Sequence, residues 1–178
     1  MQSLDNLLWI DLEMTGLDVN KNRIIEIACI VTDKELNILA TGPDLPIKTS
    51  RFRLSRMDDW NKTHHRDSGL IKMIQVNGVD MQEAENLILD FIKEFCVAGK
   101  TIIAGSSIHH DRKFIDKYMP KFSSYLHHRM LDVTSVRELQ KRWYVELPNL
   151  DKKEAHRALD DIKESIEWLR YLRSNIFK

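Results

Sequence analysis

Ile10-Asp11-Leu12-Glu13-Met14-Thr15-Gly16 is the stretch that decides the fold of this 178-residue chain. It continues an apolar segment, residues 7–10, whose composition is typical of a short buried β-strand. Asp11 and Glu13 are two residues apart, so their side chains leave the same face of an extended chain. Two carboxylates on one face repel each other unless a cation lies between them. The stretch therefore predicts a strand that ends at a site for a hard divalent metal, Mg²⁺ or Mn²⁺.

The composition is that of an ordinary globular protein, with 43% hydrophobic and 30% charged residues. The 27 basic and 27 acidic side chains give a net charge of zero, which argues against a protein that grips long nucleic acids regardless of sequence. Cys29 and Cys96 lie in apolar segments, which favours buried reduced thiols over a disulfide or a zinc site. With no signal-peptide pattern and no run of about 18 apolar residues, we expect a soluble cytoplasmic protein without a membrane span.

The first part of the chain predicts an antiparallel meander of three strands, residues 7–12, 24–32 and 36–40. The second segment is apolar almost throughout and is therefore expected at the centre of a sheet. Gly42 and Pro43 are expected to end the third strand, and residues 45–48 to pair briefly at an edge.

Helical patterns then alternate with further strands. Residues 50–77 read as broken helices and residues 80–95 as the clearest helix, followed by a strand at 101–105 that is parallel to the first if the helix is its crossover. The remainder predicts a helix from near Asp111 that stops at Pro120, a strand at 130–133, a helix with Val136, Leu139 and Trp143 inward, and a final helix. We therefore predict one α/β domain over residues 1–178, with a mixed central sheet (antiparallel meander plus parallel strands) flanked by α-helices.

Three positions remain open from their residues alone. Glu26 interrupts an apolar strand, either as a rim charge paired with Arg23 or as a functional group. Trp60 is favoured as a core residue over a surface ring that stacks on a base. His64 and His65 are adjacent on a predicted helix and point about 100° apart, so they cannot both face one ligand.

Four acids and one histidine stand at predicted strand ends and helix starts: Asp11, Glu13, Asp111, His156 and Asp161. Taken alone, an Asp-x-Glu pair is more typical of a solvated strand end. His156 and Asp161 are five residues apart, about 140° on a regular helix, so they share a face only if His156 lies in the loop before the helix. Asp111 also has a structural alternative, because an acid near a helix N-terminus is favoured by the helix dipole.

This set, in this order, resembles the DEDDh exonucleases, which have a ribonuclease H-like fold. The resemblance is to the oligoribonucleases in particular and spans nearly the whole chain. It is carried by residues 9–18, 23–28, 57–61, 105–114, 117–120, 131–133 and 156–161.

The resemblance implies hydrolysis of a phosphodiester with two divalent metal ions about 3.5–4 Å apart. Asp11 is expected to bridge both ions, Glu13 and Asp161 to complete one site, and Asp111 to bind the other. His156 is the expected general base, since the ordinary pKa of histidine suits proton transfer near neutral pH.

The resemblance also implies how short RNA is chosen. Its expected contacts are Leu17 and Trp60 on the terminal bases, His65 near the 3′ end, Ser107 on the nucleotide, and Arg129 with Thr134 on the 5′ phosphate. A cap on the 5′ phosphate would limit the length of the substrate. Relatives form homodimers, so a homodimer is expected. The chain departs from the family at His128, where relatives carry tyrosine, and at Ser106, where asparagine is usual.

The favoured function is therefore a 3′-to-5′ exoribonuclease that degrades dinucleotides and slightly longer oligoribonucleotides to nucleoside 5′-monophosphates. One alternative is a tRNA-trimming or proofreading-type DEDDh exonuclease that acts on longer 3′ ends. Another is a nucleic-acid-binding module without catalysis, which would lack at least one of the five residues. The preferred metal, the base preference, the activity on DNA and the roles of His109 and His110 are left open.

Overall fold

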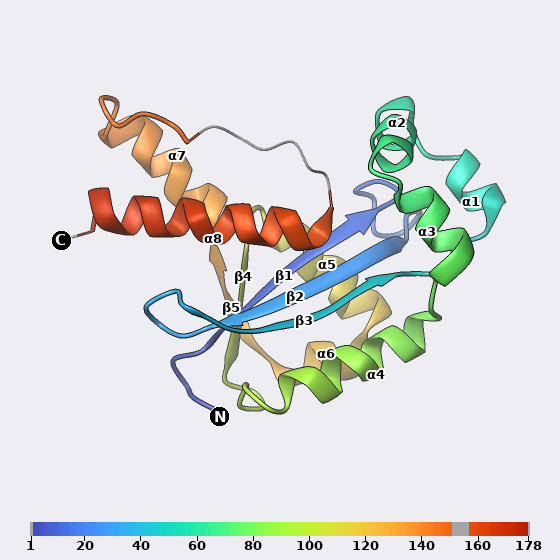
Figure 1. The fold of residues 1–178 in the computed structure, drawn as a ribbon, viewed down its shortest axis with the longest axis horizontal. Coiled ribbons are helices and arrows are strands. Elements are labelled where there is room, and N and C mark those ends of the chain that lie inside the picture. Colours follow the sequence, from blue (N-terminus) through green and yellow to red (C-terminus); the bar gives the residue numbers. More distant parts are fainter. Residues whose placement is uncertain (1, 151–156, 178) are drawn as a thin grey trace.

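The computed structural model describes residues 2–150 and 157–177, and its centre is a five-stranded mixed sheet (Figure 1). The strand order is β3-β2-β1-β4-β5, in which the first three strands are antiparallel and β4 and β5 run parallel to β1. The predicted mixed sheet is confirmed. The strands are β1 (Leu7–Met14), β2 (Ile24–Thr32), β3 (Ile38–Pro46), β4 (Thr101–Gly105) and β5 (Leu126–Asp132).

Helices cover both faces of this sheet (Figure 1). One face carries α4, α5 and α6, the other carries α7 and α8, and α1–α3 gather beyond the end of β1. Within the described residues, no helix is long and apolar enough to cross a membrane. The helices are α1 (Arg51–Ser55), α2 (Asp59–Asp67), α3 (Leu70–Asn77), α4 (Met81–Ile92), α5 (His109–Tyr118), α6 (Pro120–Tyr125), α7 (Val133–Trp143) and α8 (Ala158–Asn175).

The alternation of side chains along β1 places the two acids of the deciding stretch. Leu8, Ile10 and Leu12 face the core under α4–α6, whereas Trp9 packs in the core beneath α8. Because successive side chains of a strand point to opposite faces, Asp11 and Glu13 share the α8 side with Trp9. The pattern of β1 therefore directs both carboxylates toward the helix that carries the last predicted acid.

Strand β3 continues where the sequence predicted a break. The strand expected to end at Ala40 runs on through Gly42 and Pro43. Proline is tolerated there because β3 is an edge strand, and a register shift lies opposite, around Cys29. A Cβ atom on Gly42 would lie 2.4 Å from Cys29 Sγ, so only glycine fits this close approach.

Two predictions about helices are also corrected. Pro120 follows the end of α5 as predicted, but it also begins α6, where its fixed φ suits the first helical position. Leu139 and Trp143 were predicted to face inward on α7 and are instead 42% and 68% exposed. The face of α7 that packs on the rest of the protein carries the buried Val133 and Gln140. The apolar periodicity therefore identified an apolar face of this helix, but it did not show whether that face contacts the core.

Candidate active site

Three of the predicted acids meet between β1 and α8. Asp11 and Glu13 come from β1, and Asp161 comes from the first turn of α8. Each offers one carboxylate oxygen, and these oxygens lie within 4.8 Å of one another. This spacing is suited to a shared cation with oxygen ligands.

The electrostatics of this group also favour a cation. Burial and the charges of Asp111 and Glu13 hold the pKa of Asp11 well above its usual range. Burial, followed by the charge of Asp161, raises the pKa of Glu13 to about 8. These shifts arise because the carboxylates repel one another in a poorly hydrated place. A divalent ion would reverse them by keeping all the acids ionised.

Asp111 comes from the first turn of α5 and is buried. Its Oδ1 accepts a hydrogen bond from the backbone N–H of Leu12 at 2.9 Å. Strand β4 pairs with β1 only as far as Trp9, so this carboxylate satisfies a strand N–H that β4 does not reach. Burial raises the pKa of Asp111 to about 7. Among the neighbouring charges, that of Asp111 contributes most to the raised pKa of Asp11. The fourth acid is therefore held beside the other three, from the opposite side of β1.

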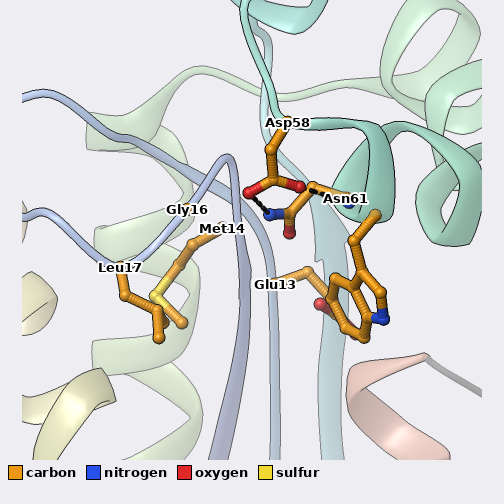
Figure 2. Close-up of a pocket in the computed structure, with 7 residues that line it drawn as sticks. Glu13, Met14, Gly16, Leu17, Asp58 and Asn61 are labelled. Carbon is orange, nitrogen blue, oxygen red and sulfur yellow. Dashed lines mark hydrogen bonds between the residues drawn. The ribbon is translucent and has the colours of Figure 1, made fainter.

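A cleft of about 550 Å³ opens beside Glu13 (Figure 2). Leu17 and Met14 lie to one side of Glu13 in this view, and Asp58 and Asn61 lie above it. The residues that line the cleft are Glu13, Met14, Gly16, Leu17, Asp58, Trp60 and Asn61.

Two large apolar side chains of the cleft are exposed to solvent. Leu17 and Trp60 are each 61% exposed, so the interpretation of Trp60 as a core residue is wrong. Trp60 lies in the first turn of α2, and its ring stacks on that of His64 with the centroids 3.8 Å apart. Asp58 holds this turn by accepting a hydrogen bond from the backbone N–H of Asn61 at 2.8 Å. The exposed indole therefore presents a flat apolar face at the edge of the cleft.

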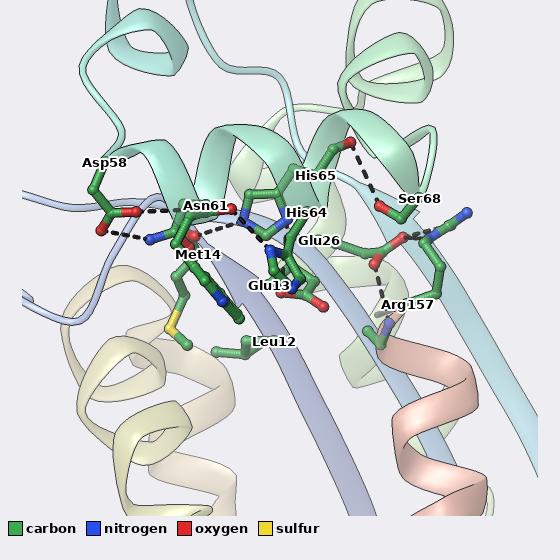
Figure 3. A network of polar contacts seen from close by, with 12 residues as sticks. Leu12, Glu13, Met14, Glu26, Asp58, Asn61, His64, His65, Ser68 and Arg157 are labelled. Carbon is green, nitrogen blue, oxygen red and sulfur yellow. Dashed lines mark hydrogen bonds and ion pairs between the residues drawn. The ribbon is translucent and has the colours of Figure 1, made fainter. Parts of the chain in front are cut away.

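His65 lies on the face of α2 that is turned away from solvent, and it is buried against β1 (Figure 3). Its Nε2 donates to the carbonyl of Met14 at 3.1 Å, and its Nδ1 lies 3.9 Å from a carboxylate oxygen of Glu13. Burial lowers the pKa of His65, which favours the neutral ring. His64 points elsewhere, toward Trp60, so the predicted divergence of the two histidines is confirmed.

Ser107 and Thr134 are brought together at the carboxyl ends of β4 and β5. Their hydroxyl groups are 3.2 Å apart. Asp132 organises the pair, because its Oδ1 accepts the backbone N–H groups of Ser107 at 2.8 Å and Thr134 at 3.0 Å. Ser107 has a φ of 55°, a left-handed conformation that is costly for serine and often marks a functional position. Sequence reasoning missed the role of Asp132, although an acid directly before a predicted helix is an N-cap signal.

Among the described residues, the structure does not bring Arg129 into polar contact with the other predicted site residues, and it does not describe His156. Arg129 is exposed on β5, and no hydrogen bond or ion pair among the described residues joins its side chain to Ser107 or Thr134. His156 lies outside the described residues. Asp160, which precedes Asp161 in the first turn of α8, is exposed and pairs with Lys163, an arrangement typical of a solvated acid.

Glu26 is fully buried, and its partner is Arg157 rather than Arg23. Arg23 instead donates to the hydroxyl of Tyr118 at 2.7 Å. The rim-charge interpretation of Glu26 is therefore wrong.

A mixed sheet whose central strand ends at three clustered carboxylates, with Asp111 close by, is compatible with the divalent-metal sites of nucleases. Residues 8–169 match the model of the exonuclease family (RNase_T), and the chain belongs to this family. The curated relatives that it resembles are oligoribonucleases. It is 50% identical to the mitochondrial oligoribonuclease of Homo sapiens over 97% of this chain and 73% of that protein. It is 47% identical to the oligoribonuclease of Escherichia coli K12 over 98% of this chain and 97% of that protein. The predicted family is confirmed.

Solved structures with the same fold include exonuclease I. The zinc-bound complex of E. coli exonuclease I with single-stranded DNA has a TM-score of 0.75 at 17% identity and matches 99% of this chain. Exonuclease I of Methylocaldum szegediense has a TM-score of 0.76 at 20% identity and matches 97% of this chain. The match covers only 41% of each of these longer proteins. At this identity the likeness establishes the fold, and it confirms the ribonuclease H-like expectation.

Proposed function

We propose that this protein is a 3′-to-5′ exoribonuclease that degrades dinucleotides and slightly longer oligoribonucleotides to nucleoside 5′-monophosphates. The observation that carries the proposal is the meeting of Asp11, Glu13 and Asp161 beside a cleft framed by exposed Leu17 and Trp60. Such a cleft offers both hydrolytic chemistry and a stacking surface that tolerates any base. Relatives that are 47–50% identical carry the name oligoribonuclease, which supports the substrate class.

The carboxylates fit divalent metal ions, Mg²⁺ or Mn²⁺. Their oxygens are clustered, and burial together with mutual repulsion raises the pKa values of Asp11 and Glu13. We propose Asp11, Glu13, Asp161 and Asp111 as the ligands of two ions, with Asp11 shared. Two such ions would supply an activated water at neutral pH and neutralise charge on the scissile phosphate.

The protein's own groups complete this chemistry. We assign His156 as the general base that accepts the proton of the attacking water. His65, held neutral beside Glu13, would face the 3′ end of the substrate. Leu17 and Trp60 would pack on the two terminal bases, so that the scissile phosphate lies over the carboxylates.

The 5′ phosphate is assigned to the carboxyl ends of β4 and β5. The hydroxyl groups of Ser107 and Thr134, fixed by Asp132, can donate to phosphate oxygens, and Arg129 on the same strand as Asp132 would add a positive charge. A phosphate held there would limit the length of RNA that fits between it and the carboxylates. This cap is the proposed origin of the preference for short RNA.

A direct test compares a dinucleotide that carries a 5′ phosphate with the same dinucleotide that ends in a 5′ hydroxyl. Wild-type protein should cleave the phosphorylated form with the higher kcat/KM, and Arg129→Ala should reduce that advantage by about 10- to 150-fold, the value of a charged hydrogen bond. The 5′-hydroxyl substrate is the internal control, because its cleavage should not respond to Arg129→Ala. Equal cleavage of both substrates by the wild type would refute the cap.

We also propose that residues 1–178 form one domain and that two copies form a homodimer. The compartment that we propose is a reducing one such as the cytoplasm. The exposed apolar side chains at the end of α7 and near the C-terminus support an interface with a second copy. They line a small groove of about 160 Å³ whose residues include Leu139, Trp143 and Phe177. The two cysteines are free and buried, as suits a reducing compartment. Light scattering should give twice the monomer mass, and Trp143→Glu should give the monomer.

One observation favours the alternative, an exonuclease that trims longer RNA. A second cleft of about 680 Å³ borders the first and carries the basic side chains of Lys21, Arg23, Arg53 and Arg56. A longer strand could lie on this surface. The two functions differ in how the rate depends on oligomer length.

A further inference from the structure

A buried ion pair between Glu26 and Arg157 lies beside the proposed metal site (Figure 3). Glu26 on β2 is directly opposite Glu13 on β1 in the register of the sheet. Its side chain is fully buried, and that of Arg157 is 20% exposed. Arg157 donates to Glu26 Oε1 from Nε at 2.8 Å and from Nη2 at 2.5 Å. This pair joins residues that are 131 positions apart in the sequence.

The other carboxylate oxygen of Glu26 caps helix α8. The backbone N–H of Ala158, the first residue of α8, donates to Glu26 Oε2 at 3.1 Å. A helix start leaves N–H groups unpaired and positive, and Arg157 at the N-cap position makes no capping hydrogen bond with its side chain. Glu26, on strand β2, therefore caps the N-terminus of α8. Both of its oxygens bind the start of α8.

We infer that Glu26 and Arg157 are positioning residues that set Asp161 against the carboxylates of β1. Asp161 is one helical turn after Arg157, and its backbone N–H donates to the Arg157 carbonyl at 3.0 Å. A shift of Arg157 is therefore passed through this rigid turn to Asp161. The inference rests on the metal site of the proposed function.

The chemistry of the pair supports positioning over packing. Replacing a buried ion pair by apolar residues of similar volume is often neutral or stabilising, because two charges lose their hydration on burial. A charged pair instead fixes direction, since its hydrogen bonds hold only in one geometry. Arg157 Nη2 also lies 3.6 Å from Asp44 Oδ2 on β3, which ties the helix start to a third strand.

The test measures metal binding as well as catalysis in the full-length protein. Mn²⁺ is titrated by calorimetry without substrate, and kcat and KM are measured on a dinucleotide. Groups that orient metal ligands typically contribute 10- to 100-fold to affinity or activity. For Glu26→Gln we therefore expect the Kd for Mn²⁺ to rise at least tenfold and kcat to fall at least tenfold. KM should stay within about twofold, since Leu17 and Trp60 come from other elements.

Arg157→Lys provides a second variant, which keeps the positive charge but loses the paired donors, and it is measured in the same way if Glu26→Gln does not fold. We expect the same direction of change for both. The matched control is Glu35→Gln, which removes the ion pair that Glu35 makes with Arg173 near the other end of α8. It should leave Mn²⁺ affinity and kcat unchanged.

Two results would overturn the inference, and they are distinguishable. If the wild type binds Mn²⁺ but both variants bind it equally well and keep the wild-type kcat, with only a lower melting temperature, the pair is structural. If the wild type itself binds no Mn²⁺, the proposed metal site fails and the inference fails with it.

Discussion

Replacing Trp60 by alanine should reduce catalytic efficiency without reducing stability. The side chain is 61% exposed, so its removal opens no cavity in the core, and the free energy of unfolding should change by less than about 0.5 kcal/mol. Stacking of one base on an aromatic side chain is worth about 1–3 kcal/mol, and about 1.4 kcal/mol corresponds to a factor of ten. We therefore expect kcat/KM for a dinucleotide to fall by about 5- to 150-fold.

The assay is hydrolysis of a dinucleotide at substrate concentrations below KM, with urea unfolding measured in parallel. Trp60→Phe keeps an aromatic face and should retain most of the activity. Leu4→Ala is the control for loss of an exposed apolar side chain, because Leu4 is 71% exposed and lines neither cleft. An unchanged kcat/KM for Trp60→Ala would refute the stacking role. A loss of several kcal/mol in stability would show that Trp60 is a core residue after all.

Three further predictions follow from the carboxylates and the edge strand. Asp11→Asn should abolish hydrolysis. Its melting temperature without metal should equal or exceed that of the wild type, because the variant lacks one of the mutually repelling carboxylates. A variant that keeps the wild-type activity would contradict the metal assignment. The pKa of Glu13 is raised from 4.5 to about 8, so the folded state holds its proton more tightly than the unfolded state. Stability in EDTA should therefore fall as the pH rises from about 4.5 to 8, and Mn²⁺ should remove that fall; parallel curves with and without Mn²⁺ would contradict it. Gly42→Ala should lower the free energy of unfolding by about 1–3 kcal/mol in urea, because its Cβ would collide with Cys29, and an unchanged value would show that β3 can yield.

The strands were the most predictable part of the fold. Residues 24–32 and 101–105 coincide with β2 and β4, because each is a nearly continuous apolar run of a length and composition typical of a buried strand. The two-residue spacing of Asp11 and Glu13 was equally informative, since it fixes a shared face wherever the strand lies. Their approach to Asp161 was expected from the resemblance and is seen in the structure, whereas the metal-binding roles remain predictions.

Long-range partners could not be read from the sequence. One interpretation of Glu26 paired it with Arg23, a cation close to it in the sequence. In the structure Glu26 pairs with Arg157 instead, 131 positions away. The residues alone favoured the core for Trp60, and periodicity predicted Trp143 to face inward, yet these side chains are 61% and 68% exposed among the described residues. Periodicity identifies the apolar face of a helix, but only the tertiary arrangement decides what lies against it.

The most direct test of the account is the cleavage of 5′-labelled RNA of two to about ten nucleotides with Mg²⁺ or Mn²⁺, and with EDTA. The account predicts that dinucleotides are cut fastest, that the rate falls as the oligomer grows, and that EDTA stops the reaction. Faster cleavage of longer RNA with dinucleotides left intact would contradict the cap formed by Ser107, Thr134 and Arg129, and would make the protein a trimming exonuclease. Cleavage that continues in EDTA would contradict the metal site itself.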